Sequence, residues 1–151
     1  MNDISESEAR SLLASFTYCE MDRDWMPEKI QPGTYTLAAG LLDKDGVGTR
    51  MQVELRFRRS HKTGLISYVF SVFKRTPHGT ERVYQLDVRH SKKPIKNLHD
   101  KSHEHMGSRR SEGQEFWLHW QFEDVLQYFC NTTNIIMSPG PNHPEHFELK
   151  G

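Results

Sequence analysis

The ten residues RMQVELRFRR, Arg50 to Arg59, decide the fold class of this 151-residue chain. Apolar side chains occupy every second position of the stretch, at Met51, Val53, Leu55 and Phe57. Polar side chains, most of them arginine, fill the positions between. Strict alternation over this length predicts a β-strand with one face buried and the other face in water. The face in water is mostly basic.

The segments around this strand predict a sheet of consecutive antiparallel strands. Residues 65–74, LISYVFSVFK, and residues 82–90, RVYQLDVRH, are rich in β-branched and aromatic side chains, and short polar turns separate the three strands. A further apolar run at residues 34–42 ends in the turn sequence DKDG. In the strand over 82–90, Asp87 falls on the face opposite the aliphatic side chains.

The sequence predicts one amphipathic helix before the strands of this sheet and one after them. Ser5 and Glu8 have the spacing of a capping box, and apolar side chains at helical spacing follow, which predicts a helix over residues 6–19. The pattern FEDVLQYFC predicts a second helix over residues 121–132. Between the sheet and this helix, residues 115–120, EFWLHW, are expected to form a short last strand.

These elements predict an α+β fold, an antiparallel four- to five-stranded meander sheet with an N-terminal and a C-terminal amphipathic helix. The length suits a single domain over residues 1–151. Residues 138–151 contain three prolines and are expected to be a frayed tail. Residues 91–113 are polar with little periodicity and are expected to form a long loop.

The composition limits the class of protein. No apolar run approaches the roughly 18 residues that a membrane span needs, and the N-terminus lacks the order of a signal peptide, so we expect a cytoplasmic protein without membrane contact. Cys19 and Cys130 are too few and too far apart for a disulfide framework and are expected to be buried free thiols. From Arg89 to Arg110, seven lysines and arginines stand against two acidic residues, a balance that favours a phosphate-rich partner.

The stretch HDKSHEHMG, His99 to Gly107, holds three histidines, and three interpretations of it are open. A metal site needs imidazoles that converge, but His103 and His105 share a face only in an extended chain, and His99 and His103 only in a helix. Acid–base catalysis on an RNA phosphodiester needs two proton-transfer groups near fixed cations, and histidine suits both roles. The third interpretation is a solvated polar loop whose histidines only form hydrogen bonds.

The catalytic interpretation names its residues directly. Proton transfer falls to the histidines of this stretch and to two residues of the preceding strand and its end: His99, His103, His105, Asp87 and His90. Binding of the nucleic-acid backbone falls to cationic side chains nearby and on the basic strand face: Arg56, Arg58, Lys62, Lys101, Arg109 and Arg110. This chemistry requires no metal ion and no cofactor.

Between Tyr68 and Gly107 the order of motifs is Y-x-F, a turn, V-Y-Q-L-D, a histidine, and then H-E-H-M-G. This layout resembles the TumE-type toxin family of bacterial toxin–antitoxin systems, and the helix motif F-E-D-V-L extends the resemblance over residues 68–130. After the aspartate the family has Asn-Ala-Pro-His-His, whereas this chain has Val-Arg-His-Ser. Matched by position, the resemblance implies roles for six residues: Asp87, His90, His99, His103, His105 and Gly107.

We therefore expect a small toxin-like protein of a bacterial or phage conflict system that binds or cleaves RNA through the histidine-rich stretch. Its expected partners are RNA and a cognate antitoxin, and an uncovered sheet edge would allow a homodimer. The alternative is a non-enzymatic, phage-encoded inhibitor that binds and blocks a bacterial defence complex of the CRISPR type. Protein that leaves RNA intact but co-elutes with such a nucleic-acid-processing complex would favour the alternative.

Overall fold

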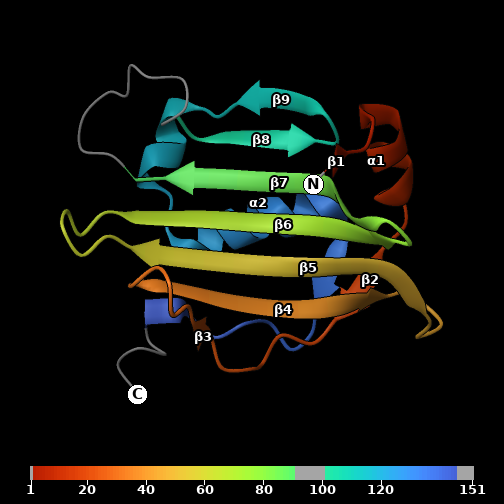
Figure 1. The fold of residues 1–151 in the computed structure, drawn as a ribbon, viewed down its shortest axis with the longest axis horizontal. Helices are drawn as coiled ribbons and strands as arrows, with labels where there is room; N and C mark the ends of the chain where they lie inside the picture. The colour runs from red at the N-terminus through yellow and green to blue at the C-terminus, as the bar shows by residue number, and fades with distance from the viewer. Residues whose placement is uncertain (1, 91–100, 146–151) are drawn as a thin grey trace.

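Ten strands form one sheet within the part of the chain that the structure, a computed structural model, describes: residues 2–90 and 101–145 (Figure 1). The strands are β1 (Asn2–Asp3), β2 (Thr17–Cys19), β3 (Met26–Pro27), β4 (Thr34–Leu42), β5 (Gly48–Arg59), β6 (Ile66–Thr76), β7 (Gly79–Arg89), β8 (His103–Met106), β9 (Arg109–Glu112) and β10 (Ile135–Met137). Their order is β10-β2-β4-β5-β6-β7-β8-β9, with β1 beside β7 and β3 beside β4. Pairing is antiparallel except for β10 with β2 and β1 with β7. The α+β class is confirmed.

The long strands β5, β6 and β7 confirm the alternation seen in the sequence. Leu55 pairs in register with Phe70, and Phe70 pairs with Leu86, so apolar side chains of three adjacent strands lie on one face. All three side chains are fully buried. Because side chains alternate along a strand, Arg56 and Asp87 lie on the opposite face.

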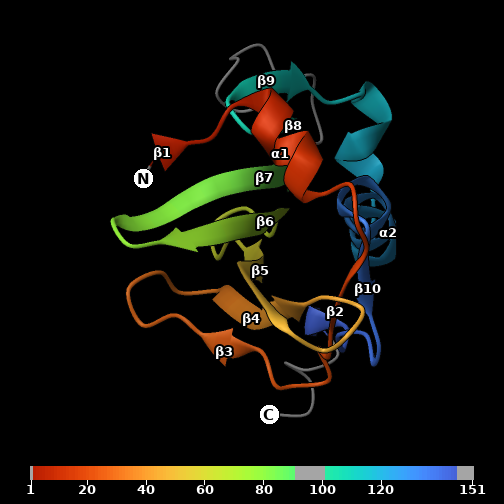
Figure 2. The same cartoon turned by 90° about the vertical axis from the view of Figure 1, so that its right-hand side faces the viewer.

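Helix α2 (Phe122–Thr133) covers the apolar face of the sheet, as Figure 2 shows, and confirms the predicted C-terminal helix. The Phe129 ring is fully buried, 5.7 Å from the ring of Phe70 and 5.8 Å from that of Tyr84. We call the opposite face of the sheet the polar face. It carries Arg58, Ser67, Asp87, Arg89, His103 and His105.

The N-terminal helix is shorter than predicted. Helix α1 (Glu6–Leu12) begins after Ser5, whose hydroxyl accepts a hydrogen bond of 3.1 Å from the backbone N–H of Glu8, as the capping-box spacing predicts. The continuation to residue 19 is wrong, because Thr17–Cys19 form β2 between β10 and β4. Backbone pairing on both sides of this short segment overrides its helical periodicity.

The described part of the predicted polar loop is a β-hairpin rather than a loop. Strands β8 and β9 extend the sheet beyond β7, so the sheet is larger than the predicted four or five strands. Gly107 turns the chain between them at a φ of +58°, and a Cβ atom there would lie 2.4 Å from the carbonyl oxygen of Ser5. Polar side chains on both faces hid the hairpin from the alternation pattern. The predicted last strand at 115–120 is also wrong, because Glu115–His119 form a 3-10 helix, η2.

Residues 138–145, where the sequence predicts a frayed tail, hydrogen-bond to the N-terminal part of the chain. The Pro139 carbonyl accepts a 2.9 Å hydrogen bond from the backbone N–H of Met21, and the Asn142 carbonyl accepts a 2.8 Å bond from the indole N–H of Trp25. Trp25 is itself fully buried. This segment therefore helps to enclose one end of the core.

Two expectations from the composition can be compared with the structure. Cys19 is a buried free thiol as predicted, whereas Cys130 on α2 is a free thiol that is only half-buried. Within the described ranges, no helix is long and apolar enough to cross a membrane.

Candidate functional site

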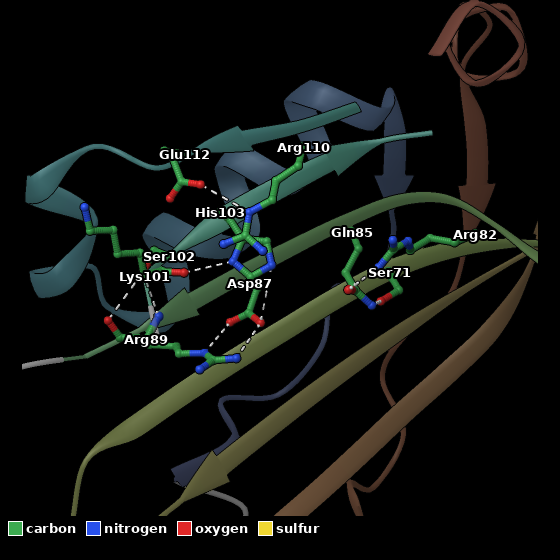
Figure 3. A network of polar contacts seen from close by, with 10 residues as sticks. All are labelled: Ser71, Arg82, Gln85, Asp87, Arg89, Lys101, Ser102, His103, Arg110 and Glu112. Carbon is green, nitrogen blue, oxygen red and sulfur yellow. Dashed lines mark hydrogen bonds and ion pairs between the residues drawn. The ribbon is translucent and has the colours of Figure 1, made fainter. Parts of the chain in front are cut away.

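Antiparallel pairing brings the candidate residues of β7 and β8 side by side on the polar face (Figure 3). Asp87 pairs in register with His103. On the next strand, Glu112 pairs with His103 and Arg110 pairs with His105. A shift of this register by one residue would turn both histidines toward the core. The register of the hairpin therefore positions the site.

Asp87 is only 6% exposed, and an arginine on the same strand balances its charge. The Nε atom of Arg89 lies 3.1 Å from one carboxylate oxygen of Asp87, and its Nη2 atom lies 3.2 Å from the other. The hydroxyl of Ser102 accepts a 2.9 Å hydrogen bond from the backbone N–H of Arg89. Because a two-point pair of this kind is strong and directional, it holds both side chains in place.

His103 is 6% exposed and faces the carboxylate of Asp87. Its Nδ1 atom lies 2.8 Å from the carbonyl oxygen of Lys101. A carbonyl only accepts, so Nδ1 carries the hydrogen and donates it. Its Nε2 atom lies 3.9 Å from an Asp87 oxygen, a contact that is attractive only when the imidazole is protonated. The ring of His103 therefore lies between the Lys101 carbonyl and the Asp87 carboxylate.

His105 lies in surroundings of the opposite kind. Its ring packs edge-on against the ring of His103, with 5.1 Å between the ring centroids. Burial lowers the pKa of His105 to about 4, and the positive charge of Arg82 acts in the same direction. Arg82 is held by a two-point ion pair with Asp3, at 2.8 and 2.9 Å. His105 is therefore a neutral imidazole at pH 7 in an electropositive place.

The low pKa of His105 predicts that the folded protein loses stability in acid. Unfolded, the imidazole binds a proton near pH 6.5, whereas the folded protein binds it only near pH 4. Because the unfolded chain holds more protons between these values, stability falls as the pH drops from 6.5 to 4. His105→Gln removes the titrating group, so its urea midpoint should fall less between pH 7 and pH 5 than that of the wild type. An equal fall in both proteins would contradict the assignment.

Glu104, between the two histidines, points to the other face and anchors β8. Its carboxylate accepts a 3.1 Å hydrogen bond from the hydroxyl of Tyr84 on β7 and another from the hydroxyl of Tyr128 on α2. Burial and the Glu104 carboxylate raise the pKa of both tyrosines, so both stay protonated and donate. Sequence reasoning missed this anchor. Its signal is parity, because a residue between two histidines on a strand must face the core.

A hollow of about 380 Å³ opens on the polar face next to Asp87 and Arg89. Strands β5, β6 and β7 and the turn between β5 and β6 form its walls. Its lining includes three arginines, two serines and a single carboxylate: Arg56, Arg58, Arg89, Ser60, Ser67 and Asp87. The apolar side chains of Leu65, Ile66 and Val69 also line it. The lining therefore carries a net positive charge.

The structure brings together only part of the predicted catalytic set. Asp87, His103 and His105 lie side by side, whereas His99 lies outside the described residues. His90 packs edge-on against the core residue Tyr68, at 5.8 Å, and its Nε2 donates to the carbonyl of Trp120. Its Nε2 is thus committed to the fold. Its candidate role in catalysis has no support from this contact.

The predicted backbone-binding cations differ in their surroundings. Arg58, Lys62 and Lys101 are exposed. The other three are engaged with acids of the chain: Arg56 with Glu28 at 3.0 Å, Arg109 with Glu6 at 3.5 Å and Arg110 with Glu112 at 3.1 Å. Two further arginines of β7, Arg82 and Arg89, were not among the predicted backbone-binding cations; Arg82 acts on His105, and Arg89 binds Asp87 beside His103. Strand parity places Arg89 on the polar face, whereas Arg82 reaches Gln85 on that face only because the register of β7 with β6 shifts at Val83, which parity does not reveal.

No protein-family model, no curated protein and no solved structure matches this chain. The resemblance of residues 68–130 to TumE-type toxins therefore stays a prediction. Among residues 2–90 and 101–145, no three histidine, cysteine, aspartate or glutamate side chains gather closely enough to hold a metal ion.

Proposed function

We propose that the protein binds RNA across the polar face and cleaves it without a metal ion, as a toxin-like protein of a bacterial or phage conflict system. The observation that supports this function best is the pair His103 and His105. The centroids of their rings lie 5.1 Å apart, and His103 lies beside the Asp87 carboxylate while His105 lies near the Arg82 cation. A carboxylate beside one imidazole and a cation beside the other suit the first to act as acid and the second as base.

The reaction is an attack of the RNA 2′-oxygen on the adjacent phosphorus. Neutral His105 accepts the proton of the 2′-hydroxyl, and a 2′,3′-cyclic phosphate forms. The bond from phosphorus to the 5′-oxygen breaks, and His103, acting in its protonated form, supplies a proton to that oxygen. Arg82 and Arg110 stabilise the charge that develops on the phosphate. Each proton transfer of this kind accelerates the reaction by about 10²- to 10⁴-fold.

Incubation of the purified protein with a single-stranded RNA in excess EDTA tests this function. We expect the RNA to be shortened with time, because the proposed acid and base are side chains of the chain itself. The same RNA with 2′-O-methyl groups should stay intact, since its attacking oxygen is blocked. RNA that stays whole at every protein concentration would refute the cleavage proposal.

The burial of His103, at 6% exposure, favours a second candidate function. A side chain this enclosed reaches a substrate only if the surface opens, whereas a binding protein needs no such access. The alternative is an inhibitor that occupies a nucleic-acid-processing defence complex with its basic surface and has no turnover. It predicts intact RNA together with co-elution of the protein and a CRISPR-type complex on size-exclusion chromatography.

A further inference from the structure

The hollow on the polar face contains a cation and a hydroxyl that the fold does not use. Arg58 lines the hollow and is exposed, and within the described ranges its guanidinium has no hydrogen-bond or ion-pair partner. The hydroxyl of Ser67, on the neighbouring strand, likewise has no partner among the described residues. Both groups can donate hydrogen bonds, and both line the same hollow. They are available to an external acceptor.

The register of the sheet sets these groups in a line. Arg58 on β5 pairs with Ser67 on β6, and Ser67 pairs with Arg89 on β7. Adjacent strands lie about 4.8 Å apart, so the backbones of Arg58 and Arg89 lie one strand spacing from Ser67, on opposite sides of it. A tetrahedral anion above Ser67 can therefore face a guanidinium on each side. Guanidinium groups bind phosphate through parallel hydrogen bonds, which suits this arrangement.

The charges of the lining identify the ligand as an anion. Glu28 pairs with Arg56 at 3.0 Å, and Asp87 pairs with Arg89 at both of its oxygens. The charge of Arg58 is left without compensation by the described residues. A ligand that brings one strong negative group would supply what the hollow lacks.

The size and the apolar wall narrow the chemical class further. The volume of the hollow, about 380 Å³, is at the small end of the range for pockets that hold small molecules. This volume exceeds what a bare phosphate fills. Leu65, Ile66 and Val69 offer an apolar surface to the non-phosphate part of the ligand. We propose that this hollow binds the terminal phosphate of a nucleotide, with the phosphate between Arg58 and Ser67 and the sugar and base against these apolar side chains.

The assignment of the ligand as a nucleotide rests on the proposed RNA function, whereas the assignment of an anionic group beside Arg58 and Ser67 rests on the hollow alone. Arg89 and Gln85 are four residues apart on β7, and Gln85 pairs with His105. The register position of Arg89 thus lies about 13 Å along the strand from that of His105, whereas His103 pairs with Asp87, which itself lines the hollow. A 5′-phosphate held in the hollow would place a nearby internal phosphodiester of the same strand at His105.

Isothermal titration calorimetry with AMP and adenosine tests the proposal. We expect AMP to bind and adenosine to bind at least about tenfold more weakly, because only AMP offers a charge to Arg58. Arg58→Gln should lower the affinity for AMP by about tenfold or more, and Ser67→Ala should lower it by a few-fold. Arg75→Gln is the matched control, since Arg75 is an exposed arginine on β6 that does not line the hollow. It should bind AMP as the wild type does.

Three results would overturn the proposal: no binding of AMP, equal affinity for AMP and adenosine, or unchanged AMP binding by Arg58→Gln with wild-type melting temperature. A 2′-O-methylated oligonucleotide with a 5′-phosphate separates the two sources of the ligand. Binding much tighter than AMP identifies an RNA end, and equal binding identifies a free nucleotide. RNA cleavage without AMP binding would remove only this subsite. AMP binding without cleavage would remove only the proposed catalysis.

Discussion

His105→Ala is expected to slow RNA cleavage by about 10²- to 10⁴-fold, the contribution of one positioned proton-transfer group. His105 is a neutral imidazole at pH 7, because burial and Arg82 lower its pKa to about 4. Alanine removes the proposed base and leaves its neighbour His103 with its contacts to Lys101 and Asp87. The measurement is the initial rate of cleavage of a labelled RNA in EDTA.

His119→Ala is the matched control for this variant. His119 is exposed at the end of η2 and lies outside the histidine pair. The melting temperatures of both variants should stay within a few degrees of the wild type, so that a lower rate reports chemistry rather than unfolding. Equal rates for the wild type, His105→Ala and His119→Ala would exclude His105 from the reaction.

Phe129→Ala is expected to lower the free energy of unfolding by about 3–5 kcal/mol. The ring is fully buried where α2 meets the sheet and contacts the rings of Phe70 and Tyr84. Its removal leaves a cavity that the surrounding β-strands cannot collapse to fill. Urea unfolding followed by circular dichroism measures the change.

Phe116→Ala removes the same number of atoms from an exposed position. Phe116 is 59% exposed on η2, so this variant should change the free energy of unfolding by no more than about 1 kcal/mol. Similar losses for the two variants would mean that α2 does not cover the core at Phe129.

The central strands could be predicted from the sequence because one face of each is buried. In β5, Leu55 and Phe57 face the core while Arg56 and Arg58 face the polar side, and this alternation is visible in the residues alone. The outer strands carry no such signal. β8 has Glu104 on its inner face, where two tyrosines satisfy the carboxylate, so the strand lacks an apolar stripe.

The site was predictable in its residues but not in its geometry. Parity alone places Asp87 on the face away from the aliphatic side chains, and extended chain alone places His103 and His105 together. The pairing of Asp87 with His103 depends on the register between β7 and β8, which a single sequence does not fix. The sequence also did not reveal that the ring of His90, predicted as a catalytic group, contacts Tyr68 in the core.

The chemical nature of the RNA ends tests the central claim most directly. If His103 and His105 transfer the protons of a 2′-oxygen attack, mass spectrometry of the products made in EDTA will find 2′,3′-cyclic phosphates and 5′-hydroxyls. The His105→Ala protein will leave the RNA essentially whole over the same time. Products that end in 3′-hydroxyl and 5′-phosphate, or wild-type amounts of product from His105→Ala, would contradict the assignment of this histidine pair.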